Sequence, residues 1–235
     1  KGNYLILQID PAYEAPEMEE KQIFGVTFTQ KHNDLKIEPS CLENIVTENK
    51  ELPEEAKEDM LIALIALKYT QSNSVAFAYD GQTIGIGAGQ QSRVHCTRLA
   101  GSKADNWQLR LTDKVLNLPW KAGTRRPNKD NFIDRYIAME DTPEANVDID
   151  WTELFETKPE PFTLEEKRQL LDKVDGVTLA SDAFFPFADN IDRAKASGAK
   201  YIVQPGGSTR DDLVLEACNK YGMVMCYNGF RLFHH

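Results

Sequence analysis

The sequence predicts an α/β protein, built from layered helices and a mostly parallel C-terminal sheet. Strand-like segments are expected at 176–181, 200–205 and 223–228, and the helices between them at 189–198 and 209–222. Strands joined by helical crossovers pair in parallel, and ligands of such sheets collect at the carboxyl ends of the strands. The segments that follow these strands are 182–190, 205–209 and 229–233. We therefore expect a binding site at that edge.

Length and composition indicate an ordinary globular protein. The chain has 235 residues, of which 41% are hydrophobic and 27% charged, enough for a sizeable core. A net charge of −10 disfavours a nucleic-acid partner, because phosphate backbones require excess Lys and Arg. The four cysteines form no CxxC motif, and the longest apolar run, 60–67, is too short to span a membrane. We expect a cytosolic protein with reduced thiols.

The N-terminal half mixes strands and helices. Strands are expected at 4–10 and 22–30, and a chain that opens in a strand suggests that an upstream segment is missing. A helix is expected over 52–70, with Pro53 near its start. Its buried face is predicted to consist of Met60, Leu61, Leu64, Ile65 and Leu67.

A hairpin and a second helix follow. Asp80-Gly81 supplies the positive φ angles of a tight hairpin turn within 73–89. The next helix is expected from Ser92, a candidate N-cap, to Gly101, its predicted stop.

The chain divides into three predicted parts. Residues 1–102 form an α/β subdomain that starts mid-domain, 103–161 an irregular, partly helical insertion, and 162–235 the βαβαβ portion that completes the fold. A helix at 162–174 opens the last part, with Thr163 and Glu166 as a capping box.

The stretch "IGIGAGQQSRVHCTRLAG" (84–101) resembles a nucleotide loop only at first sight. A dinucleotide fingerprint requires glycines at its first, third and sixth positions, and this spacing is absent. Gly85 and Gly87 lie on one side of a predicted strand, where another backbone or a ligand comes close. His95 and Cys96 point about 100° apart on a helix and cannot easily share a metal ion. We expect no zinc, and a packed or hydrogen-bonded His95.

Anion recognition remains as an explanation. Gln90, Gln91 and Ser92 would lie at a helix start, where free N–H groups attract negative charge. Arg93 could fork onto a phosphate or carboxylate, or equally pair with a surface acid.

Three stretches together resemble one known family. They are "KYTQSNSVAFAYDGQTIGIGAGQQSRVHCTRLAG" (68–101), "SDAFFPFADN" (181–190) and "FRLFHH" (230–235). They are similar to the bifunctional purine-biosynthesis enzyme that joins a cyclohydrolase to aminoimidazole carboxamide ribonucleotide (AICAR) transformylase, in a form typical of eukaryotes. The resemblance is weakest over 103–160 and covers only the C-terminal part of the family's length.

The resemblance implies a fold similar to cytidine deaminase, without zinc, and a reaction. The formyl group of 10-formyltetrahydrofolate moves to the 5-amino group of AICAR, and the sister domain closes the product to inosine monophosphate. This amine is a weak nucleophile, so the step requires a base, an acid and stabilisation of an oxyanion. The family uses an adjacent Lys-His pair. The one such dipeptide here, Lys31-His32, is interpreted as a surface turn, so the catalytic pair is expected upstream.

The family's AICAR-binding positions match four residues of this chain. Asn73 corresponds to the asparagine that binds the carboxamide and orients the catalytic histidine, and Arg93 to a nucleotide-contacting arginine. Phe184 corresponds to an aromatic against the AICAR ring, and Arg231 to the arginine that binds the phosphate. Without the family, Asn73 reads as a turn residue.

The folate-binding positions match a second set. They are Val94, Asn131, Pro186, Phe187, Asp189, Ser208 and Thr209. Asp189 corresponds to the carboxylate that binds the pterin, and from the pattern alone it is also an N-cap. Val94, Pro186 and Phe187 could equally be ordinary packing, and Thr209 replaces a small apolar residue of the family.

The resemblance also implies an ion and partners. A potassium ion is possible at Thr70, Ser72, Ser74, Asp182 and Leu232. The family forms homodimers whose sites are shared between subunits, and the upstream part of the same enzyme is expected as a further partner. Two alternatives stay open: a catalytically silent binding and dimerisation fragment, and, less favoured, a deaminase-like protein that binds another nucleotide.

Overall fold

A computed structural model describes residues 2, 4–139 and 151–234. Residues 140–150, part of the predicted insertion, lie outside the described residues. The chain separates into two compact units, Lys1–Lys36 and Ile37–His235, and each is described by itself.

The first unit contains one antiparallel hairpin. Strands β1 (Met18–Ile23) and β2 (Val26–Lys31) are joined by a turn in which Phe24 and Gly25 have positive φ. The expected single strand at 22–30 is therefore wrong, because this turn interrupts it. The expected strand at 4–10 is also wrong. No strand is described there, and the apolar side chains of this segment are largely exposed. A strand requires a neighbour for its backbone groups, which composition alone does not reveal.

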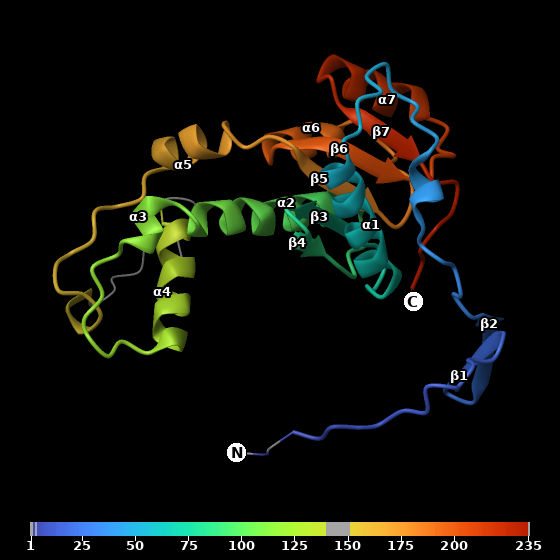
Figure 1. Ribbon diagram of the computed structural model, residues 1–235, viewed down its shortest axis with the longest axis horizontal. Helices are drawn as coiled ribbons and strands as arrows, with labels where there is room; N and C mark the ends of the chain where they lie inside the picture. Colours follow the sequence, from blue (N-terminus) through green and yellow to red (C-terminus); the bar gives the residue numbers. More distant parts are fainter. Residues whose placement is uncertain (1, 3, 140–150, 235) are drawn as a thin grey trace. The chain divides into compact units, whose positions relative to one another are not determined.

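The second unit is built on a five-stranded mixed sheet (Figure 1). Its strands, in spatial order, are β4 (Gln82–Gly87), β3 (Val75–Tyr79), β5 (Val177–Ser181), β6 (Ala199–Gln204) and β7 (Val224–Tyr227). The last three are parallel, as predicted, whereas β3 runs antiparallel to both β4 and β5. The predicted α/β class is confirmed.

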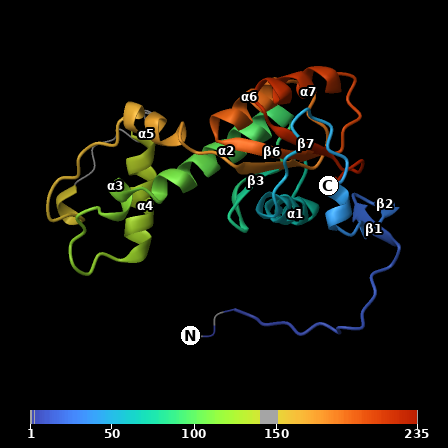
Figure 2. The ribbon, with the colours of Figure 1, turned by 45° about the horizontal axis from the view of Figure 1, so that its top comes forward.

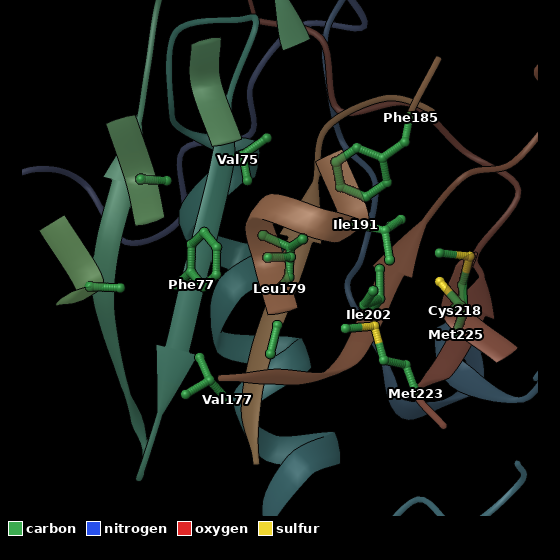
Figure 3. Close-up of a cluster of buried hydrophobic side chains, with 14 of the residues drawn as sticks. Val75, Phe77, Val177, Leu179, Phe185, Ile191, Ile202, Cys218, Met223 and Met225 are labelled. Carbon is green, nitrogen blue, oxygen red and sulfur yellow. The ribbon is translucent and has the colours of Figure 1, made fainter. Parts of the chain in front are cut away.

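Helices cover both faces of this sheet (Figures 1 and 2). They are α1 (Glu54–Lys68) on one face and α2 (Arg93–Arg110), α6 (Asp189–Ala196) and α7 (Asp211–Lys220) on the other. Figure 3 shows the core beneath the second group, where Phe77, Leu179 and Ile202 are fully buried. Each such side chain contributes about 1.5–3 kcal/mol to folding. Within the described residues, no helix is both long and apolar enough to cross a membrane.

Helix α2 does not stop at Gly101, as the sequence predicted, but continues to Arg110. A Cβ at Gly101 would lie 2.7 Å from the Arg193 guanidinium. Arg193 in turn donates to Asp105 on α2, at 2.9 Å. Gly101 thus serves close packing between α2 and α6 rather than helix termination.

The segment after α2 has its own small core. It contains α3 (Asp113–Leu116), α4 (Arg126–Ala138), the short 3₁₀ helix η3 (Trp151–Glu153) and α5 (Leu164–Leu171). Buried aromatic residues here include Phe132, Tyr136, Phe155 and Phe162. Helix α2 runs through residue 102, and the three-part division of the chain stays a prediction.

Helix α1 buries a carboxylate that the apolar pattern did not indicate. Ile65 is exposed, against prediction, whereas Asp59 is only 4% exposed. Asp59 accepts hydrogen bonds from the N–H groups of Asp80 (3.1 Å) and Gly81 (2.8 Å). Burial raises the pKa of Asp59. The carboxylate stabilises the predicted hairpin turn, in which both central residues have positive φ.

The predicted capping box of α5 is confirmed and gives a pH-dependent prediction. Lys114 Nζ lies 2.6 and 2.7 Å from the two oxygens of Glu166, and Thr163 N donates to Glu166 at 2.9 Å. The Lys114 hydrogen bond, together with those of Thr163, lowers the pKa of Glu166 from 4.5 to about 2. This stabilisation is present above pH 4.5 and is lost as the pH falls towards 2.

We expect Glu166→Gln to lower the free energy of unfolding at pH 7 by at most about 1 kcal/mol, since water screens this partly exposed pair. The difference from wild type should shrink at pH 3, as urea unfolding at both pH values would show. Glu165→Gln, which keeps the Lys114–Glu166 contact, is the control. An equal loss at both pH values would contradict the ionic origin.

Candidate functional site

Five chain segments meet at one edge of the sheet. Residues 182–190, 205–209 and 228–233 follow the carboxyl ends of β5, β6 and β7. Val75 pairs with both Ser181 and Gly87, so the start of β3 and the end of β4 lie at the same edge. The predicted gathering of segments at the strand ends is confirmed, with two antiparallel strands contributing.

Asp182 is the buried centre of this edge. Its carboxylate accepts from Ser72 Oγ at 2.6 Å, and from Ser74 N and Ser74 Oγ at 3.0 Å each. Its other oxygen pairs with Arg93. The backbone carbonyl of Asp182 accepts from Leu232 N at 2.9 Å. One fully buried residue therefore joins the segment between α1 and β3, the start of α2 and the C-terminal segment.

Arg93 lies at the first turn of α2 and is buried, with 8% of its surface exposed. Its Nη1 pairs with the buried Asp182, not with a surface acid, and donates to Ser74 O at 2.8 Å. Its Nη2 donates to Asn73 Oδ1 at 3.1 Å. Since a guanidinium has five N–H groups, two remain for other partners.

Asn73 is held on both sides of its amide. Besides accepting from Arg93, it donates from Nδ2 to Gln90 O at 2.9 Å. One N–H and one lone pair are left for a ligand. The thiol of Cys96 donates to Asn73 O at 2.9 Å. Burial raises the pKa of Cys96, which keeps the thiol protonated as a donor.

Arg231 is exposed and lies among aromatic rings. Its guanidinium stands 5.4 Å from the Phe184 ring centre and 5.7 Å from that of Phe233. Its neighbour Leu232 is the residue that donates to Asp182 O. Arg231 and Phe184 are therefore next to the buried group around Asp182.

The remaining loop residues follow β5 and β6 at the same edge. Phe187 is 49% exposed and carries the Arg210 guanidinium 5.0 Å from its ring centre. Arg210 follows Ser208 and Thr209, and its N–H donates to Ser208 Oγ at 3.2 Å. Asp189 is exposed in the first turn of α6, whose N-cap is Ala188, so the N-cap prediction is wrong by one residue.

Comparison with known proteins shows which family the chain resembles. The family model described as AICARFT/IMPCHase bienzyme matches residues 1–103. The bifunctional purine biosynthesis protein PurH of Xylella fastidiosa (strain 9a5c) is 30% identical over 236 residues, which is 100% of this chain. Its counterpart in Magnetococcus marinus is 33% identical over 219 residues, or 93% of the chain. The chain is similar to one portion of these bifunctional proteins. It spans 32% and 30% of these two relatives.

Gly85 and Gly87 of β4 lie against the backbone of α2. A Cβ at Gly85 would overlap the carbonyl oxygen of Ala100, and one at Gly87 that of Cys96. The close approach predicted for these glycines is therefore made by the backbone of α2. His95, expected to be packed or hydrogen-bonded, is exposed.

The proposed potassium donors fit an alkali ion in kind, since they are hydroxyl, carbonyl and carboxylate oxygens. Ser72, Ser74 and Asp182 form one hydrogen-bonded group that Leu232 joins. Thr70 Oγ1 instead donates to Ala66 O at 2.7 Å. The ion stays a prediction. No group of three or more His, Cys, Asp or Glu residues suited to a metal occurs in the described parts of the chain.

Asn131 lies away from the other candidates of this chain. It is exposed on α4, beside Asp130, which pairs with Arg110 at the last turn of α2. Arg93 is at the first turn, and 17 residues of helix separate the two arginines by about 25 Å. Val94, by contrast, directly follows Arg93 and is half-buried.

A cavity of about 380 Å³ occupies the opposite edge of the sheet, lined by Asp59, Tyr79, Gly176 and Tyr201 among others. It contains none of the candidates. Sequence reasoning also missed three buried polar residues near the site, Thr97, Asn190 and Gln204. The sequence feature that could have identified them is a polar residue at a position that faces the core. Gln204 is an example, because it accepts a hydrogen bond from Phe185 N at 2.7 Å.

Proposed function

We propose that this chain forms part of an AICAR transformylase site, where formyl transfer from 10-formyltetrahydrofolate to the 5-amino group of AICAR serves purine biosynthesis. The observation that carries the proposal is the hydrogen-bonded group of the half-buried Asn73 and the buried Arg93 and Asp182. It lies at the edge where ligands of parallel sheets bind. The matches to bifunctional purine biosynthesis proteins support the same assignment.

Asn73 and Arg93 are suited to hold a carboxamide. Each is fixed by hydrogen bonds within the protein, yet keeps donors in reserve. Such preorganised groups bind a ligand amide without first losing side-chain freedom. In our proposal they orient the AICAR carboxamide, and with it the adjacent amine.

Arg231, Phe184 and the loop residues would hold the rest of both substrates. A guanidinium exposed among rings can grip a phosphate with paired hydrogen bonds. The exposed Asp189 carboxylate offers a fixed acceptor to the N–H groups of a pterin. Val94, Pro186, Phe187, Ser208 and Thr209 complete the proposed folate side.

Proton transfer is assigned to residues outside this chain. Lys31 ends β2 and His32 lies 3.6 Å from Glu19, so this Lys-His pair belongs to the first unit and is not at a turn. We propose that the catalytic pair comes from the rest of the protein, and that the 235-residue chain alone is a silent binding part. The protein is proposed to be a cytosolic homodimer, in which Asn131 serves the partner's site.

Formyl transfer and ligand binding test the function. We expect the full-length protein to catalyse transfer and the isolated chain to be inactive. Arg231→Ala should raise the KM for AICAR about 10- to 100-fold, the worth of a charge-assisted hydrogen bond. Arg168→Ala, which removes an exposed ion pair on α5, should leave it unchanged.

Two outcomes would change the conclusion. Activity in the isolated chain would contradict the silent-part assignment. If neither AICAR nor a folate analogue raised the melting temperature of the full-length protein, a deaminase-like protein for another nucleotide would be favoured, because a bound ligand stabilises the fold.

A further inference from the structure

A second buried polar contact joins α2 to the loop that carries Phe187 and Asp189. Thr97 lies one turn beyond Arg93, and its side chain, like that of Asn190, is fully buried. Thr97 Oγ1 is 2.8 Å from Asn190 Oδ1. Buried polar groups are costly unless they are hydrogen-bonded. Thr97 and Asn190 satisfy each other in this way, and we next consider what their contact holds in place.

The orientation of the Asn190 amide follows from its neighbours. Its Nδ2 donates to Phe187 O at 3.1 Å and to Asp189 Oδ1 at 3.0 Å. Both partners are acceptors, so the NH₂ group must face them and Oδ1 must face Thr97. The Thr97 hydroxyl also lies 3.1 Å from Arg93 O, but because Asn190 Oδ1 at 2.8 Å can only accept, the hydroxyl proton is directed at Asn190.

The buried Asn190 amide is hydrogen-bonded to two exposed residues, Phe187 and Asp189. Phe187 and Asp189 are exposed, whereas the residue that ties them together is fully buried. Asn190 is bonded in turn to Thr97 on α2, the helix that also carries Arg93. The two proposed halves of the site thus share one rigid element.

We infer that Thr97 and Asn190 are positioning residues for the folate side. They hold the Asp189 carboxylate and the Phe187 backbone at a set distance from the first turn of α2. This inference rests on the proposed function and adds two residues to it.

Thr97→Val in the full-length protein tests the inference, because it keeps the shape and removes the hydroxyl. We expect the KM for 10-formyltetrahydrofolate to rise about three- to tenfold, the worth of one hydrogen bond, with little change for AICAR. Thr97→Ser should recover most of the loss. Hydrogen exchange of the backbone amides over 184–190 should accelerate in Thr97→Val alone.

The matched control breaks another contact between the same two helices. Ser197 Oγ donates to Asp105 Oδ1 at 2.6 Å, farther along α2. Ser197→Ala should lower the melting temperature without altering the folate KM. Equal KM effects from both variants, or unchanged exchange over 184–190 in Thr97→Val, would overturn the inference. If the wild-type protein transfers no formyl group, the proposed function fails, and the exchange measurement still decides whether Thr97 positions the loop.

Discussion

Replacing Gly85 by alanine is expected to destabilise the protein by about 3 kcal/mol or more, the upper part of the range for overpacked cores. The new Cβ would overlap Ala100 O and lie 2.8 Å from Ala104 N. Both atoms belong to the backbone of α2, so no side-chain rotation relieves the contact. The helix would have to move away from β4, and with it the first turn that carries Arg93. We therefore expect formyl transfer by the full-length protein to fall as well.

Urea unfolding of the chain would measure this loss. At a site with open space and ordinary φ, the same substitution stabilises a protein by about 0.4–1 kcal/mol, so the sign itself is diagnostic. Gly101→Ala should cost less stability than Gly85→Ala. Its new Cβ meets only the movable end of the Arg193 side chain, and alanine has a higher helix propensity than glycine. A second substitution, Ala104→Gly, should not rescue Gly85→Ala. Rescue would show that side chains, and not the backbone of α2, set the distance between β4 and α2.

Local patterns predicted the C-terminal half well. Strands β5 to β7 and helices α6 and α7 begin and end within about two residues of their expected limits, since each is short and bounded by turn residues. The hairpin turn at Asp80-Gly81 was predicted from its φ requirement. Patterns failed where the deciding contact is distant in sequence. Gly101 was interpreted as a stop because its partner, Arg193, is 92 positions away.

The site shows the same limit. Residue type placed Arg93 among the candidates and the family resemblance added Asn73 and Asp182, but neither gave their mutual contacts. Arg93 and Asp182 are 89 residues apart, and no local rule pairs them. Spacing allowed Arg93 a surface acid as its partner, whereas the acid that pairs with it in the fold is the buried Asp182. The assignment of β4 glycines to helix packing also depends on tertiary structure.

Breaking the Arg93–Asp182 pair is the other substitution with a large expected effect. Asp182 is fully buried and the Arg93 side chain is 6% exposed. Asp182→Asn would leave a guanidinium that cannot lose its proton in a dry environment. The expected loss in free energy of unfolding is about 3–5 kcal/mol. Because Arg93 also fixes Asn73, kcat should fall at least about tenfold, or 1.4 kcal/mol in the barrier.

The double variant Arg93→Met/Asp182→Leu separates charge from packing. Replacing both partners of a buried ion pair by apolar residues is often nearly neutral for stability, so the double variant should unfold closer to wild type than Asp182→Asn does. Activity should not return, since the double variant removes the Arg93 Nη2 donor that holds Asn73. Asp105→Asn, which weakens the partly exposed Arg193–Asp105 pair, should cost less stability and leave kcat unchanged. If stability and kcat recovered together in the double variant, the pair would act on the fold alone and not on the orientation of Asn73.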